Sequence, residues 1–165
     1  KKLVNKDSLE IVQVVVKLKT KSAAGDVLNN VVFGLVLQPS SQGKGGLARG
    51  QGLGVFYHKG KIAIRVAGGN LDPYKDGELH VVQKDGVDLE WPEDRDGRGV
   101  LIEIARKNAD GEVTLRVGDQ EILTDRFSTL RRAKGDLELW LGGWSNRAQN
   151  WEVGVERIRV VRRKP

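Results

Sequence analysis

The sequence lacks cysteine and methionine, and it has only 4 prolines, 4 tryptophans, 2 tyrosines and 3 phenylalanines in 165 residues. The absence of cysteine excludes a disulfide framework, thiol catalysis and cysteine-ligated metal sites. No apolar run approaches the ~20 residues of a membrane-spanning helix, which excludes insertion by such a helix. Hydrophobic residues make up 39% and charged residues 30% of the chain, so we predict one globular domain over residues 1–165.

Two further features concern origin and partners. The sequence begins with Lys1 and contains no initiator methionine, so we expect a processed, trimmed or excised segment, such as one that follows a removed signal peptide or leading domain. We expect the parent protein to be extracytoplasmic, that is, secreted, periplasmic or at the cell surface. The 28 basic and 22 acidic residues give a formal charge of +6, which favours anionic partners. Because the two signs are interleaved, the pattern disfavours nucleic acid, which requires a stripe of one sign.

Alternation of apolar and polar residues dominates the chain and predicts β-strands. Turn residues separate two pairs of alternating segments, at His58–Gly60 and at Asn108–Gly111, and each pair is predicted to form a hairpin. The apolar phase slips by one residue between Val155 and Ile158, which predicts a β-bulge. The expected strands cover 12–18, 31–37, 53–57, 62–66, 100–104, 113–117, 137–141 and 151–160, and irregular loops are expected at 39–52, 68–77 and 91–99. We predict an all-β fold, an antiparallel two-sheet β-sandwich of the jelly-roll kind.

Several of these strands carry a family resemblance. The segments are 52–57, 100–105, 112–122, 135–142 and 151–161. Together they resemble the concanavalin A-like lectin/glucanase superfamily, in particular its laminin-G-like domains. The resemblance implies a two-sheet sandwich that hosts lectins, carbohydrate-binding modules, glycosidases, polysaccharide lyases or adhesion domains. Such a scaffold does not choose among these functions.

Trp140 is the most informative residue. It is in phase with Asp136 and Glu138 and opposite to Leu139, so it is predicted to project from the non-core face of its strand. A flat indole there provides a stacking platform for a sugar ring. The alternative is that loops cover this face and Trp140 is simply packed.

The segment 142–151 is rich in side chains that recognise glycans. Trp144 adds a stacking ring, Asn146 an amide and Arg147 a cation for an acidic sugar. Alternatively, these residues supply turn geometry and anchor the last strand. The predicted carbohydrate-binding set is completed by Arg65 and His80, on the outward phase of their strands, and by Tyr57. The alternative for Arg65 and for His80 is an ordinary solvated side chain.

Enzymatic alternatives depend on acid pairs or a base beside a cation. A glycosidase requires two carboxylates. Asp136 and Glu138, two residues apart on one face of a strand, could supply such a pair. The sequence lacks one acid of the pattern to which the family's retaining glucanases conform. A lyase would use Tyr57, His58 or His80 as a base beside Arg65, although nothing in their spacing requires it.

Two further hypotheses concern ions. Asn70, Asp72 and Asp76 place oxygen ligands in one loop, and laminin-G-like domains often bind calcium through loop acids. This loop lacks the EF-hand pattern, and acid-rich turns are usually only solvated.

Basic residues gather in the early and last strands. If these strands pair, the cations either hold a sulfated or uronate polysaccharide or protect a sheet edge. These basic residues are Lys17, Lys19, Lys21, Arg157, Arg159, Arg162, Arg163 and Lys164.

The sequence thus predicts a non-catalytic carbohydrate-binding or adhesion module without a required cofactor. The alternatives are a glycoside hydrolase or polysaccharide lyase of the same fold, and a structural domain that packs against a neighbouring domain or an identical copy.

Overall fold

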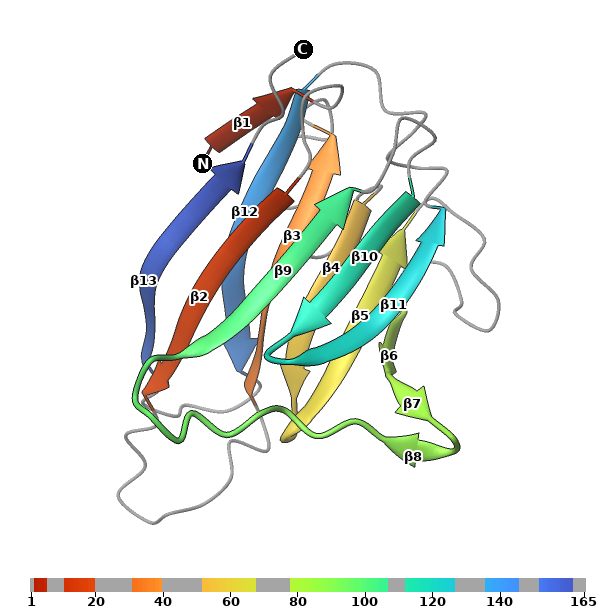
Figure 1. Cartoon of the computed structure of the whole chain (residues 1–165), viewed down its shortest axis with the longest axis vertical. Helices are drawn as coiled ribbons and strands as arrows, with labels where there is room; N and C mark the ends of the chain where they lie inside the picture. The colour runs from red at the N-terminus through yellow and green to blue at the C-terminus, as the bar shows by residue number, and fades with distance from the viewer. Residues whose placement is uncertain are drawn as a thin grey trace.

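The protein is a two-layer antiparallel β-sandwich in the computed structural model, which describes residues 2–5, 11–19, 31–39, 52–67, 78–106, 112–126, 136–145 and 152–161. The two main sheets face each other (Figure 1). This confirms the predicted fold class.

The six-stranded sheet has the order β1-β12-β3-β4-β5-β6. Its strands are β1 (Lys2–Asn5), β12 (Asp136–Ser145), β3 (Val31–Pro39), β4 (Gly52–His58), β5 (Lys61–Ala67) and β6 (Leu79–Val81).

The five-stranded sheet has the order β11-β10-β9-β2-β13. Its strands are β11 (Gln120–Arg126), β10 (Glu112–Val117), β9 (Val100–Arg106), β2 (Ile11–Lys19) and β13 (Glu152–Val161). A separate small hairpin joins β7 (Gln83–Lys84) to β8 (Val87–Asp88).

Alternation explains the main core, because every second residue of each strand faces the opposite sheet. In the six-stranded sheet Leu35, Val55 and Ile64 lie in register on this inner face, and each is fully buried. Opposite them, the inner faces of β2, β9 and β10 supply buried valine, isoleucine and leucine. The core therefore lies between the two sheets.

The predicted hairpin turn between β4 and β5 is confirmed. Lys59 and Gly60 have φ of 51° and 77°, the pair of positive values that a two-residue type I′ turn requires. The predicted bulge in the last strand is confirmed as well, since the pairing of β13 with β2 shifts between Val155 and Arg157. The early and last long strands do pair, as the grouping of basic residues required.

The irregular segment 89–99, here called the strap, runs from the β7–β8 hairpin to β9 across one end of the sandwich (Figure 1). It is tied to the six-stranded sheet by hydrogen bonds from Ile62 N to Leu89 O at 2.8 Å and from Trp91 N to Gly60 O at 2.7 Å. Trp91 is buried and packs edge-on against Tyr57, with ring centroids 5.6 Å apart. Its indole thereby closes that end of the core.

The predicted loop at 91–99 is confirmed as irregular. Of the two other predicted loops, Pro39 and Gly52 belong to strands, whereas residues 40–51 and 68–77 lie outside the described residues. In the described ranges, no helix has the length and apolarity to cross a bilayer.

Candidate functional site

Trp140 lies on the outer face of the six-stranded sheet, as its phase predicted. It is opposite Val36 on β3, while the flanking Leu139 faces the main core. Trp140 packs with a second apolar cluster, separate from the core between the sheets. This second cluster contains Val32, Val36, Phe56 and Ala63, with Leu79 and Trp140 partly buried against it.

Glu138 fixes the indole of Trp140. The Trp140 Nε1–H donates a hydrogen bond to Glu138 Oε2 at 3.1 Å, between side chains two residues apart on one strand face. Glu138 is only 2% exposed, so its carboxylate is a buried acceptor. Because the indole N–H already has an acceptor within the protein, a ligand would contact Trp140 through the exposed part of its flat apolar ring.

Phe56 forms the floor of the second cluster. Its ring lies over Gly34 of β3 and Gly54 of its own strand, where a Cβ at either position would overlap it. Phe56 and Ala63 are fully buried and Val36 is 5% exposed, so the centre of this face is closed. A ligand would therefore contact Trp140 at the margin of the face.

That margin is the part of β12 that extends past β1. The pairing of β1 with β12 ends at Lys2 and Leu139, and among the described strands none pairs with β12 beyond it on that side. Residues 140–143 are all partly exposed, and two of them are the glycines Gly142 and Gly143. The indole of Trp140 thus lies beside a stretch of strand with little side-chain bulk.

Arg65 shares the face of Trp140. The register runs from Trp140 through Val36 and Gly54 to Arg65, which spans three strand spacings or about 14 Å. Arg65 is partly exposed. Because Val36 and Gly54 between them are buried, Trp140 and Arg65 do not line one continuous open trough.

Tyr57 and His80 do not lie on this face, which corrects their predicted grouping with Trp140. Tyr57 is 7% exposed within the main core, where burial raises the pKa of its hydroxyl. His80 is opposite Ile64, a core residue, so it shares the inner side of the sheet at its edge, 3.9 Å from Glu78. The physical reason is the pleat, since residues directly opposite each other on paired strands face the same side.

For the remaining predicted site residues, the strand register is known for two, and the others lie outside the described residues. Asp136 is opposite Asn5 and Trp144 is opposite Val32 in the strand register. Asn146, Arg147, Asn70, Asp72 and Asp76 lie outside the described residues. Within the described part of the chain, no group of three histidine, cysteine or acidic side chains could hold a metal ion.

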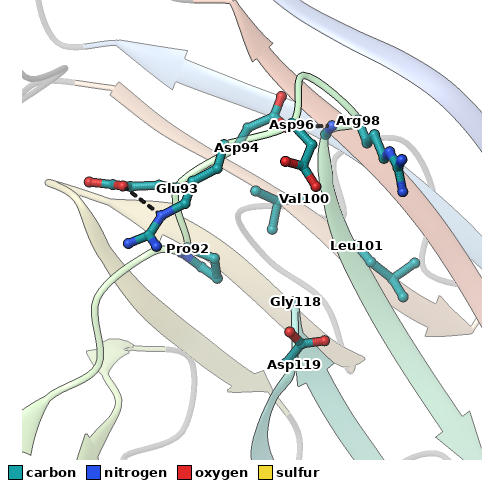
Figure 2. Close-up of a pocket in the computed structure, with 11 residues that line it drawn as sticks. Pro92, Glu93, Asp94, Asp96, Arg98, Val100, Leu101, Gly118 and Asp119 are labelled. Atoms are coloured by element: carbon teal, nitrogen blue, oxygen red, sulfur yellow. Dashed lines mark hydrogen bonds and ion pairs between the residues drawn. The ribbon is translucent and has the colours of Figure 1, made fainter.

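A pocket that the sequence did not predict lies between the strap and the β10–β11 turn (Figure 2). It is an open hollow of about 320 Å³. Asp94 Oδ1 accepts a hydrogen bond from Gly99 N at 2.8 Å, and Arg95 pairs with Glu93 at 3.2 Å. These contacts shape the strap itself, and the lining is acidic on balance, with four carboxylates and two arginines. The pocket is lined by 92–96, 98–101, 118 and 119.

The chain was compared with models of known protein families and with curated proteins. It matches no family model. It also matches none of the curated proteins. The two antiparallel sheets define the class of the protein as a β-sandwich.

Proposed function

We propose that this domain is a non-catalytic carbohydrate-binding module, with a polysaccharide docking on the margin of the six-stranded sheet beside Trp140. The observation that carries the proposal is the partly exposed Trp140 indole, whose N–H is held by the buried Glu138. An oriented ring with its polar atom satisfied offers a sugar the flat apolar surface on which pyranoses stack.

The same geometry favours binding over hydrolysis. A retaining or inverting glycosidase needs two carboxylates that reach the scissile bond from either side. Glu138 is 2% exposed and accepts the indole N–H, so it acts as a support for Trp140 and is withdrawn from substrate. Glu138 is therefore unsuited to act with Asp136 as the catalytic acid pair that the sequence offered as an alternative.

The finer assignment within this proposal is a concanavalin A-like, laminin-G-like sandwich acting outside the cytoplasm. The two antiparallel sheets are compatible with it. Trp144, four positions further along β12, is the second stacking residue that the sequence predicts. An acidic glycan suits the net charge of +6, and calcium dependence is the associated ion hypothesis.

The test is retention on a panel of neutral and acidic polysaccharides, with and without a chelator, for the wild type and Trp140→Ala. We expect the wild type to be retained on at least one polysaccharide without release of new reducing ends or unsaturated uronates. Trp140→Ala should lose most of that retention while remaining folded by circular dichroism, although its melting temperature should fall because the buried Glu138 loses the indole as a hydrogen-bond donor. Arg95→Ala, an exposed strap residue, is the control and should bind like the wild type. Equal retention of Trp140→Ala and the wild type would refute the proposal.

A further inference from the structure

The last strand of the five-stranded sheet, β13, has a free edge in the described part of the structure. Two of its side chains are large, apolar and exposed: Val155 at 39% and Ile158 at 47%. Val155 is opposite Val16, a fully buried core residue, and Ile158 is opposite position 14, two residues along the same strand and so in the same phase. Two apolar side chains that point to the core side of the sheet are thus exposed at its edge.

The bulge determines how these residues are arranged. Before it, Val153 and Val155 lie on the inner face, and after it Ile158 and Val160 lie on that same face. Because the extra residue falls at the middle of the strand, the inner-face positions are symmetric about the midpoint of Glu152–Val161. An antiparallel copy of β13 can therefore match inner residues to inner residues along the whole strand.

We infer that β13 is a self-association edge, which pairs antiparallel with β13 of a second copy about a twofold axis between Glu156 and Arg157. In this register Val155 is opposite Ile158 of the second copy, and Val153 is opposite its Val160. The symmetry makes each of these pairs twice. The exposed apolar side chains cover each other, and the two five-stranded sheets become one continuous sheet.

Charge selects the same register. Glu156 and Arg157 are both exposed, and Glu156 already pairs with Lys17 at 2.5 Å. At the axis each Glu156 is opposite Arg157 of the other copy, which gives two pairs of opposite sign. A shift by two residues in either direction would oppose Val155 to Glu156 or Ile158 to Arg157. Charges and bulges on an edge usually prevent pairing, and here they disfavour the other registers.

This inference is independent of the proposed glycan site, which lies on the other sheet. Sedimentation velocity of the full chain over a dilution series, from submillimolar to micromolar concentration, tests it directly. We expect a reversible dimer for the wild type. Ile158→Thr and Arg157→Glu should each weaken it about tenfold or more, because the symmetry removes two pairs at once. Thr keeps the branched Cβ that suits a strand, and circular dichroism verifies the fold of each variant.

Two further variants sharpen the test. The charge-swapped double variant Glu156→Arg/Arg157→Glu restores opposite charges across the axis and should regain at least part of the association that Arg157→Glu loses. Val87→Thr, at an exposed valine on the β7–β8 hairpin, should dimerise like the wild type. A wild type that stays monomeric throughout, a folded Ile158→Thr or Arg157→Glu that dimerises unchanged, or a double variant without any regain would overturn the inference.

Discussion

The indole of Trp140 and the carboxylate of Glu138 form one unit on the outer face of β12, joined by a hydrogen bond of 3.1 Å. Glu138 is buried on that face, whereas Trp140 is partly exposed. The acid therefore acts through the indole by limiting its rotation. Glu138 is thus the buried acceptor, and Trp140 is the exposed ring that it orients.

Replacing Glu138 should separate the hydrogen bond from the charge. Glu138→Gln keeps an oxygen acceptor for the indole N–H, and we expect a loss of about 1 kcal/mol or less in the free energy of unfolding. Glu138→Ala leaves the N–H without this acceptor and should cost about 1–3 kcal/mol. Urea unfolding measures both, and the Trp140 indole resonance in ¹H–¹⁵N spectra reports the lost bond. Equal stability of the two variants would show that the bond does not matter.

Two glycines provide the space for the Phe56 ring, so adding a methyl group should be costly there. We expect Gly34→Ala and Gly54→Ala to destabilise the domain by about 1–3 kcal/mol through overpacking, at Gly54 against the Phe56 ring and at Gly34 against both that ring and the backbone carbonyl of Val55. Gly154→Ala is the matched control on β13, where the nearest atom is 3.8 Å from the added Cβ. In a Phe56→Leu background, Gly54→Ala should cost less. Purely additive effects in this double-mutant cycle would contradict the packing described.

His58 predicts a dependence of stability on pH. Burial, and to a lesser extent the charge of Lys59, lowers the pKa of His58 below its usual 6.5. Protonation is then harder in the folded state than in the unfolded state. The contribution of His58 to stability is therefore complete above about pH 6.5 and is lost as the pH falls through the lowered pKa. Urea unfolding between pH 7.5 and 5 should show this decline, and His58→Gln should remove that part of it. Identical pH profiles would contradict the assignment.

Trp91 closes the end of the core, so truncating it should be among the more damaging changes. Trp91→Ala is expected to cost about 3–5 kcal/mol. Trp91→Phe should cost much less, because the buried Nε1 of Trp91 has no hydrogen-bond partner among the described residues. Thermal unfolding distinguishes the two variants. A Trp91→Ala protein with wild-type stability would mean that the strap does not contribute to the core.

Most of the long strands could be predicted from the sequence because alternation reports directly which side of a strand is buried. The exception is β11, in which Ile122 and Leu123 are adjacent and no alternation shows. The slip between Val155 and Ile158 located the bulge for the same reason. The short strands β1, β6, β7 and β8 were not predicted, since two to four residues carry too few alternations to show a period. Their pairing depends on neighbours far along the chain.

The candidate site was predictable only in part. The outward phase of Trp140 followed from Leu139 and Leu141 on either side of it. Tyr57 is in phase with Leu53 and Val55, which is a signal that it belongs to the core. The buried state of Glu138 left no such signal, because Glu138 has the outward phase at which a strand usually places a polar, solvated side chain.

The most direct test of the glycan proposal is a titration of ¹⁵N-labelled protein with an oligosaccharide of any polysaccharide that retains it, following the tryptophan indole resonances. We predict that the Trp140 Nε1–H resonance shifts saturably, while that of Trp91, buried in the core, stays unchanged. Binding that leaves the Trp140 resonance in place, or failure of every polysaccharide to retain the protein, would contradict it.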